Sequence, residues 1–290
     1  MDMHADDDFT KAFEYASGKT GERFQNPIWM ITELFTGHRF RQAISQVKAY
    51  GNSIVTHAIV SRASKRPLET TSRDEEVSGS LIYSLLDALD DTRVVADAAL
   101  NYLSAGRDTT AEALTWAFYL LMRNPEAFDH LRKEVDLDTE LTANAQPYAM
   151  AVFYETLRLY PPVPFEIKQC EQATILPDGT HLPKSAVVFW SIWAMNRSHV
   201  SWGSDSELFR PERWLHEGKL VNRTAFEFPV FNGGTRMCLG KKMAESIALS
   251  VIVKLVKQFE FQSIGEQERV SKNSLTLPME GGLPCKVVRR

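Results

Sequence analysis

The sequence predicts a mainly α-helical protein with small β-sheets. Apolar residues recur at helical spacing between residues 9 and 60, and a long helical pattern runs from Thr92 to Arg123. Strand-like segments are short and lie between residues 173 and 191 and near the end of the chain. Helices should therefore form most of the core, with strands confined to short pairs.

The composition, with 44% apolar residues and a net charge of −4, is that of a globular protein. The negative charge argues against nucleic acid as the main partner. Three scattered cysteines are too few for a disulfide framework and indicate a reducing compartment. No apolar run approaches the roughly 18 residues of a membrane span, and the acidic start of the chain is unlike a signal peptide.

Residues 1–60 are predicted to form helices that turn apolar stripes toward a core. The stripes consist of Phe9, Phe13 and Ala16, then Phe40, Ile44 and Val47, and finally Ile54 and Ala58. Residues 61–80 turn polar and charged, and they are predicted to form a loop.

The helix predicted over Thr92 to Arg123 lies within a region that spans residues 81–135. Its middle, from Ala98 to Trp116, is apolar or small on most faces, which indicates burial. The hexad Ala105-Gly106-Arg107-Asp108-Thr109-Thr110 interrupts this pattern with polar residues and with a glycine, which costs a helix about 1 kcal/mol relative to alanine. Such a hexad in a buried helix requires a reason beyond packing.

Two X-Pro pairs predict the next helices. Asn124-Pro125 begins one that reaches Val135, and Gln146-Pro147 begins another that ends at Leu159-Tyr160-Pro161, within the region 145–290. Glu155 and Arg158 form an i,i+3 pair in the second helix. An exposed pair of this kind contributes little, but the segment is too apolar for an exposed helix.

Strands are predicted around one turn and at the end of the chain. Ala173 to Leu176 and Ala186 to Ser191 flank the turn Pro177-Asp178-Gly179. The apolar run from Val187 to Trp193 is most simply a buried strand. The segment from Leu275 to Val288 is predicted to form a terminal hairpin.

The stretch from Phe228 to Ala244 holds a single cysteine, Cys238, in a glycine-rich loop before a predicted helix. Free backbone N–H groups and the helix dipole at that position favour a thiolate, so the sulfur is suited to be a ligand or a nucleophile. Glycines at positions 233, 234 and 240 allow a tight backbone path. Arg236 offers a planar fork of donors that suits a carboxylate.

Other functions of this loop are weaker matches. A phosphate loop fails on the spacing and on its final residue. Zinc would need clustered ligands, whereas Cys170, Cys238 and Cys285 lie far apart without a C-x-x-C pair. A structural cysteine buried at a tight turn remains the alternative.

Three motifs together resemble the cytochrome P450 family. Phe231, Gly234, Arg236, Cys238 and Gly240 spell F-x-x-G-x-R-x-C-x-G, which is similar to the family's haem-binding loop, with Thr235 where the family usually has proline. The hexad resembles the family's oxygen-activation motif. E-x-x-R followed by Pro211-Glu212-Arg213-Trp214 resembles its structural triad.

The resemblance implies a P450 fold, N-terminally truncated, and a role for each motif residue. Cys238 would be the axial ligand of the iron of haem b (iron protoporphyrin IX). Asp108 and Thr109 would be catalytic, with Thr109 hydrogen-bonded to dioxygen and Asp108 relaying protons. The remaining implied sites are cofactor contacts at Phe231, Gly234, Arg236, Gly240, Ala105 and Gly106, a structural network of Glu155, Arg158 and Arg213, and a substrate-pocket border at Val163 and Phe165.

The implied activity is that of a haem-dependent monooxygenase that inserts one oxygen atom of O2 into an apolar organic substrate. The short strings AGRDTTAEALTW and FNGGTRMCLGKKMAE look most like fungal and plant fatty-acid or alkane hydroxylases, so a fatty-acid-like substrate is expected. No flavin or nicotinamide motif is present, so electrons would come from a separate NADPH-dependent cytochrome P450 reductase. Lys241, Lys242 and Arg223 are expected to form its positive docking patch, with a solvated helix start as the alternative.

The resemblance covers roughly the C-terminal half of a family member, and it implies that the helices of residues 1–60 line the substrate side. It implies the cytosolic face of the endoplasmic reticulum membrane, or the cytoplasm because this chain shows no anchor. One alternative is a truncated chain that does not bind haem productively and has no catalytic activity. A haem-thiolate isomerase or peroxide-using enzyme is less favoured, because Asp108 and Thr109 suit dioxygen activation.

Overall fold

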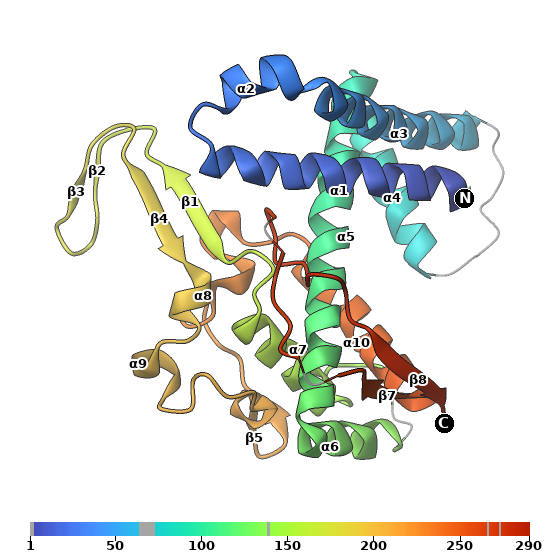
Figure 1. Cartoon of the computed structure of the whole chain (residues 1–290), viewed down its shortest axis with the longest axis vertical. Coiled ribbons are helices and arrows are strands. Elements are labelled where there is room, and N and C mark those ends of the chain that lie inside the picture. Colours follow the sequence, from blue (N-terminus) through green and yellow to red (C-terminus); the bar gives the residue numbers. More distant parts are fainter. Residues whose placement is uncertain (1–2, 64–72, 138–139, 266, 273) are drawn as a thin grey trace. The chain divides into compact units, whose positions relative to one another are not determined.

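The computed structural model describes residues 3–63, 73–137, 140–265, 267–272 and 274–290 (Figure 1). The described residues form mostly helices, together with four two-stranded antiparallel sheets. The predicted fold class, mainly α with small β-sheets, is confirmed. The chain divides into two compact units, residues 1–107 with 273–275, and residues 108–272 with 276–290.

The first unit consists of α1 (Met3–Gln25), α2 (Trp29–Thr36), α3 (His38–Ala63), α4 (Arg73–Ala88) and the first half of α5 (Thr92–Arg123). Small residues bring α1 and α3 close together, since Ala12 and Ala16 pack with Ala43. Phe9 stacks on Tyr50 with ring centroids 4.3 Å apart. The predicted stripe residues of α1 therefore face a shared core.

The loop predicted over residues 61–80 is wrong at both of its ends. Helix α3 continues to Ala63 and α4 already begins at Arg73, while residues 64–72 lie outside the described residues. Helix formation is cooperative, so a polar stretch joined to the apolar segment that begins at Leu81 is drawn into the same helix.

Helix α5 has the predicted bounds, Thr92–Arg123, and passes from the first unit into the second. Its burial is less complete than predicted. Val95, Ala113 and Trp116 are buried, whereas Tyr102, Ala105 and Gly106 are exposed. The prediction treated the whole middle of the helix as buried because most of its residues are apolar or small. In the structure, only some faces of the helix pack against other elements.

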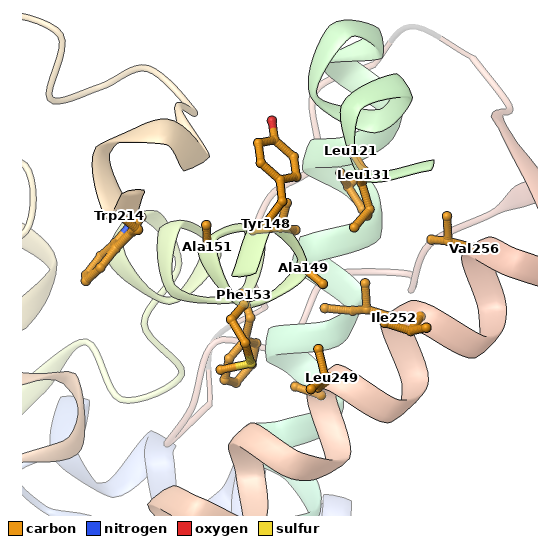
Figure 2. Packing of buried hydrophobic residues seen from close by; sticks show 14 of the residues in the cluster. Leu121, Leu131, Tyr148, Ala149, Ala151, Phe153, Trp214, Leu249, Ile252 and Val256 are labelled. Carbon is orange, nitrogen blue, oxygen red and sulfur yellow. The ribbon is translucent and has the colours of Figure 1, made fainter. Parts of the chain in front are cut away.

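The core of the second unit lies among the end of α5, α6 (Pro125–Val135), α7 (Pro147–Leu159) and α10 (Lys241–Gln258). In Figure 2, Leu249 and Ile252 of α10 point toward α7, where Ala149 and Phe153 are also buried. All but two residues of α7 are buried. This burial removes water from the helix that carries Glu155 and Arg158.

A side chain of α6 accepts hydrogen bonds from the backbone N–H groups at the start of α7. Gln146 stands at the N-cap without a side-chain cap hydrogen bond, and Glu134 instead accepts from the N–H groups of Tyr148 (2.8 Å) and Ala149 (2.9 Å). Burial raises the pKa of the Glu134 carboxyl, and these hydrogen bonds oppose that rise. The predicted starts of α6 and α7 both hold, with proline in the first turn.

The strands pair differently from the prediction. β1 (Phe165–Gln169) pairs with β4 (Val187–Ser191), and the turn at residues 177–179 joins β2 (Thr174–Ile175) to β3 (His181–Leu182). β4 is not a buried strand, because Val187 and Phe189 are 57% and 60% exposed. The pairing partner of a strand depends on tertiary contacts that local sequence does not contain.

The last strand also corrects a prediction. β8 (Cys285–Arg289) pairs with β7 (Phe259–Ser263) rather than within a terminal hairpin, although an isolated bridge joins Ser271 to Met279. The remaining elements are β5 (Leu215–His216), β6 (Lys219–Leu220), α8 (Ile192–Met195), α9 (His199–Trp202) and the 3₁₀ helices η1 (Pro211–Trp214), η2 (Pro229–Phe231) and η3 (Gly234–Arg236). None of the helices in the described ranges has the length and apolar character needed to cross a bilayer.

Candidate functional site

Cys238 is exposed and lies between η3 and α10, three residues before Lys241, the first residue of that helix. Its backbone N–H donates to the carbonyl of Phe231 at 2.7 Å, which closes the loop between them. A Cβ built at Gly240 would lie 3.9 Å from the Cys238 sulfur. The sulfur is therefore presented to solvent by a backbone that is held at both ends.

Backbone conformation and close packing account for three residues of the loop. Asn232 and Gly234 both adopt positive φ, 59° and 60°, a region that L side chains rarely enter. A Cβ at Gly233 would lie 2.8 Å from the Cβ of Ala225, too close for any larger residue. Asn232 also donates to Glu166 of β1 at 3.2 Å, which ties the loop to that sheet.

Aromatic side chains support the loop from the protein interior. Phe228 lies edge-on to Trp214, with ring centroids 4.7 Å apart, and its centroid is 6.4 Å from that of Phe231. Trp214 in turn donates from its indole nitrogen to Glu155 at 2.9 Å. A continuous set of contacts thus links Glu155 to the residue that closes the cysteine loop.

Glu155, Arg158 and Arg213 meet in a buried network. Arg158 makes a bidentate pair with Glu155, with both distances at 2.8 Å, and the Nε of Arg213 donates to Glu155 Oε1, also at 2.8 Å. The side chains of Glu155 and Arg158 are fully buried. The backbone N–H of Arg210 and the indole of Trp214 also donate to the Glu155 carboxylate, so both of its oxygens are satisfied.

The rest of the Arg158 guanidinium holds the chain that follows α8. It donates to the carbonyls of Asn196 (2.7 Å), Ser206 (2.5 Å) and Leu208 (3.0 Å). These bonds fix the segment that leads into η1, which carries Arg213 and Trp214.

Arg223 does not form the surface patch predicted with the lysines. Its guanidinium lies over Trp202 at 4.6 Å and Trp214 at 5.2 Å, and it donates to the carbonyl of Arg213 at 3.2 Å. The sequence did not predict this position of Arg223, because stacking against two tryptophans depends on tertiary packing. Lys242 is exposed, and Lys241 lies 3.9 Å from Glu245.

The hexad of α5 is divided between the two units. Ala105 and Gly106 belong to the first unit and are exposed, and a Cβ built at Gly106 would meet no atom within 4 Å. Asp108 and Thr109 belong to the second unit and are half-buried. Val163 is also half-buried, and Phe165 is exposed and stacks on Phe189 with centroids 5.3 Å apart.

The donor set of the cysteine loop fits a haem. The loop offers an exposed thiol for iron, and next to it stands the exposed Arg236, whose guanidinium has no ion-pair partner among the described residues. A guanidinium without a partner suits the carboxylates of a porphyrin. The same described ranges hold no cluster of three or more His, Cys, Asp or Glu side chains that would bind a metal ion by itself.

Sequence reasoning missed two contributors to the site. Asn232, with its positive φ and its bond to Glu166, was passed over, although asparagine before two glycines is a typical signal of such a backbone. Trp214 was read only as the end of a motif, yet its indole completes the Glu155 network.

Comparison with known proteins agrees with the motifs. The sequence matches the family described as "Cytochrome P450" over residues 5–285. It is 33% identical to cytochrome P450 94A1 of Vicia sativa, over 97% of this chain and 57% of that protein. It is 32% identical to cytochrome P450 monooxygenase cyp1 of Mycosarcoma maydis, over 98% of this chain and 49% of that protein.

The fold agrees as well. A crystal structure of a cytochrome P450, CYP102L1, superposes with a TM-score of 0.71 and 25% sequence identity, and it covers 88% of this chain and 58% of that one. The chain spans about half the length of the curated relatives that it matches. The family match, which extends over nearly all of the described residues, shows that this chain belongs to the cytochrome P450 family.

Proposed function

We propose that this chain carries the haem-thiolate centre of a monooxygenase that hydroxylates an apolar, fatty-acid-like substrate. The observation that carries the proposal is the exposed Cys238 thiol on a closed loop at the start of α10, beside an Arg236 without an ion-pair partner in the described structure. Haem b, when bound, supplies activation of O2 and transfer of one oxygen atom to the substrate.

The chain's own residues would hold the cofactor. Cys238 would bind the iron through its sulfur, and Arg236 would bind a propionate. Phe231, Gly234 and Gly240 would shape the loop that holds the cofactor, and the family resemblance assigns cofactor contacts to Ala105 and Gly106 as well. The network of Glu155, Arg158 and Arg213 would keep the loop in place through Trp214 and Phe228.

Asp108 and Thr109 would hold and move protons at the site. The Thr109 hydroxyl can donate and accept at once, and a half-buried carboxylate at Asp108 can exchange protons with solvent. This division of roles favours a monooxygenase over an enzyme that uses peroxide directly.

The substrate and the electron source are inferred from chemistry and resemblance. Exposed Phe165 and the adjoining Val163 would border an apolar substrate. Electrons would come from a separate NADPH-dependent reductase. Lys242 and Lys241 remain available to meet its acidic surface, whereas Arg223 is committed to its tryptophan contacts.

Membrane association on the cytosolic face of the endoplasmic reticulum would use α2. Five large apolar side chains on and just before this helix, those of Ile28, Met30, Ile31, Leu34 and Phe35, are 57–84% exposed. An exposed apolar face on a short helix suits the interfacial region of a bilayer.

The test is the spectrum of the reduced, CO-bound protein in the variants Cys238→Ala, Cys170→Ala and Cys285→Ala. We expect the red-shifted Soret band of a thiolate-ligated haem, lost only in Cys238→Ala. Loss of the band in one of the control variants instead would refute the assignment of the ligand. A wild-type chain that takes up no haem would refute the proposed activity and favour the non-catalytic alternative.

A further inference from the structure

Glu112 is a buried carboxyl group on α5 that the proposed function does not use. It lies one turn beyond Asp108 and Thr109, at the i,i+4 and i,i+3 positions that share a helix face. Its Oε1 accepts from the hydroxyl of Thr276 at 2.6 Å, and its Oε2 accepts from the N–H of Leu277 at 3.1 Å. All these residues belong to the second unit.

The segment that Glu112 holds is attached by a second side chain of the same helix. Trp116 donates from its indole nitrogen to the carbonyl of Leu277 at 2.8 Å, and its ring stacks on Tyr160 with centroids 3.9 Å apart. The Leu277 N–H also reaches the carbonyl of Pro162 at 3.1 Å. Glu112 and Trp116 thus hold the N–H and the carbonyl of the same residue, Leu277, against α5.

The surroundings of Glu112 disfavour its charged form. Burial, with a smaller contribution from the negative charge of Asp108, raises the pKa of the Glu112 carboxyl to about 7, while the bonds from Thr276 and Leu277 oppose the rise. Asp108 is the charged group that acts on Glu112 from its own helix. The facing residues, Thr276-Leu277-Pro278-Met279, bring no titratable group.

We propose that Glu112 is a positioning residue, a clamp that fixes the Thr276–Leu277 segment beside Asp108 and Thr109 when protonated and weakens when it ionises. The consequence for catalysis rests on the proposed function, because it requires the face of α5 that carries Thr109 to line the substrate site. The clamp itself does not depend on haem.

Both bonds survive protonation, which is why the neutral form can hold the segment. A protonated Oε1 donates to the Thr276 hydroxyl, and Oε2 still accepts from the Leu277 N–H. Glutamine reproduces this pattern without a charge. Since the folded-state pKa is raised, the closed clamp is favoured at low pH and loses stability as pH rises through 7.

The test is hydrogen exchange of the full chain at pH 6 and pH 8, with protection of the peptide that contains Thr276 and Leu277 corrected for intrinsic exchange. A carboxyl with pKa about 7 when clamped and about 4.5 when open predicts about a tenfold loss of protection over this interval. Glu112→Gln cannot ionise when the clamp opens, so it should be at least as protected as the wild type at pH 6 and show no such loss. Glu112→Leu should show low protection at both pH values.

Glu134→Gln is the matched control, because Glu134 is also a carboxyl with a raised pKa that accepts two hydrogen bonds, but at the start of α7. It should leave the pH response of the Thr276–Leu277 peptide unchanged. A wild-type change below about twofold, or a tenfold change that persists in Glu112→Gln, would overturn the proposal. The comparison of wild type with Glu112→Gln tests the clamp even if Glu112→Leu fails to fold.

The same samples separate this proposal from the proposed function. If the CO-bound spectrum shows no thiolate-ligated haem but the exchange response is as expected, the monooxygenase assignment fails and the clamp stands. If the spectrum is as expected but exchange does not respond to pH, the clamp alone is refuted.

Discussion

At the scale of single residues, the Glu155 carboxylate is the best-satisfied polar group of the site. It accepts from Arg158, Arg213, Trp214 and the Arg210 N–H, and its side chain is fully buried. A buried ion network contributes little net stability against an apolar replacement, but removing one partner leaves a charge in low dielectric without compensation. The consequences of losing Glu155 should therefore be large.

Glu155→Gln should lower the free energy of unfolding by about 3–5 kcal/mol, because two buried guanidinium groups lose their counter-charge. Unfolding in urea followed by circular dichroism measures this. Glu22→Gln is the matched control, since Lys19 and Glu22 form an ion pair of the same i,i+3 spacing that is exposed. Its effect should stay below about 1 kcal/mol. Equal effects of the two substitutions would contradict the assigned role of burial.

Residue spacing predicted some of these contacts and not others. Glu155 and Arg158 are neighbours because any helix brings i and i+3 together, so their pairing could be predicted from local sequence. Arg223 was misassigned because its stacking depends on where Trp202 and Trp214 meet. Glu112 was overlooked, although a glutamate inside an apolar helix is itself a signal that a partner is required.

At the scale of elements, helix ends were predicted well and strand partners poorly. The starts of α6 and α7 depend on an X-Pro pair, which acts within a few residues. The pairing of β8 with β7 joins segments more than twenty residues apart, and no local signal in Phe259–Ser263 or Cys285–Arg289 selects that partner. The cysteine loop could be predicted because its glycine, arginine and cysteine positions all lie within one stretch of ten residues.

Gly106, in the middle of α5, allows a test of whether this position trades helix stability for cofactor binding. A Cβ at Gly106 meets nothing within 4 Å, so Gly106→Ala should stabilise the chain by about 1 kcal/mol, as expected for a helix interior. If Gly106 leaves room for haem, the same substitution should weaken haem uptake. Thermal unfolding and haem titration measure the two effects.

Gly18 provides the control for that experiment. It lies inside α1 with no atom within 4 Å of a built Cβ, so Gly18→Ala should give the same stabilisation and leave haem uptake unchanged. Normal haem uptake by Gly106→Ala would show that this glycine is not part of the cofactor site.

At the scale of the whole molecule, exposed apolar side chains are unevenly distributed. Ile28, Met30, Ile31, Leu34 and Phe35 follow one another on and just before α2, whereas Phe226, 93% exposed, belongs to no such helix. Single exposed apolar residues are ordinary, whereas a cluster of five is a candidate surface for an apolar partner. The nearby Glu33 is already paired with Arg23, so it adds little charge to that surface.

We expect this cluster to bind lipid vesicles. The double variant Leu34→Glu and Phe35→Glu should reduce co-sedimentation of the protein with phosphatidylcholine vesicles by at least about tenfold, because each side chain contributes roughly 1 kcal/mol or more when it leaves water. The thiolate haem spectrum should not change, since α2 belongs to the unit that does not contain Cys238. Phe226→Glu is the control, as it removes an equally exposed aromatic residue outside α2. If Phe226→Glu reduces binding as much as the double variant, general hydrophobicity rather than α2 is responsible, and a wild-type protein that stays in the supernatant would exclude this surface as a membrane contact.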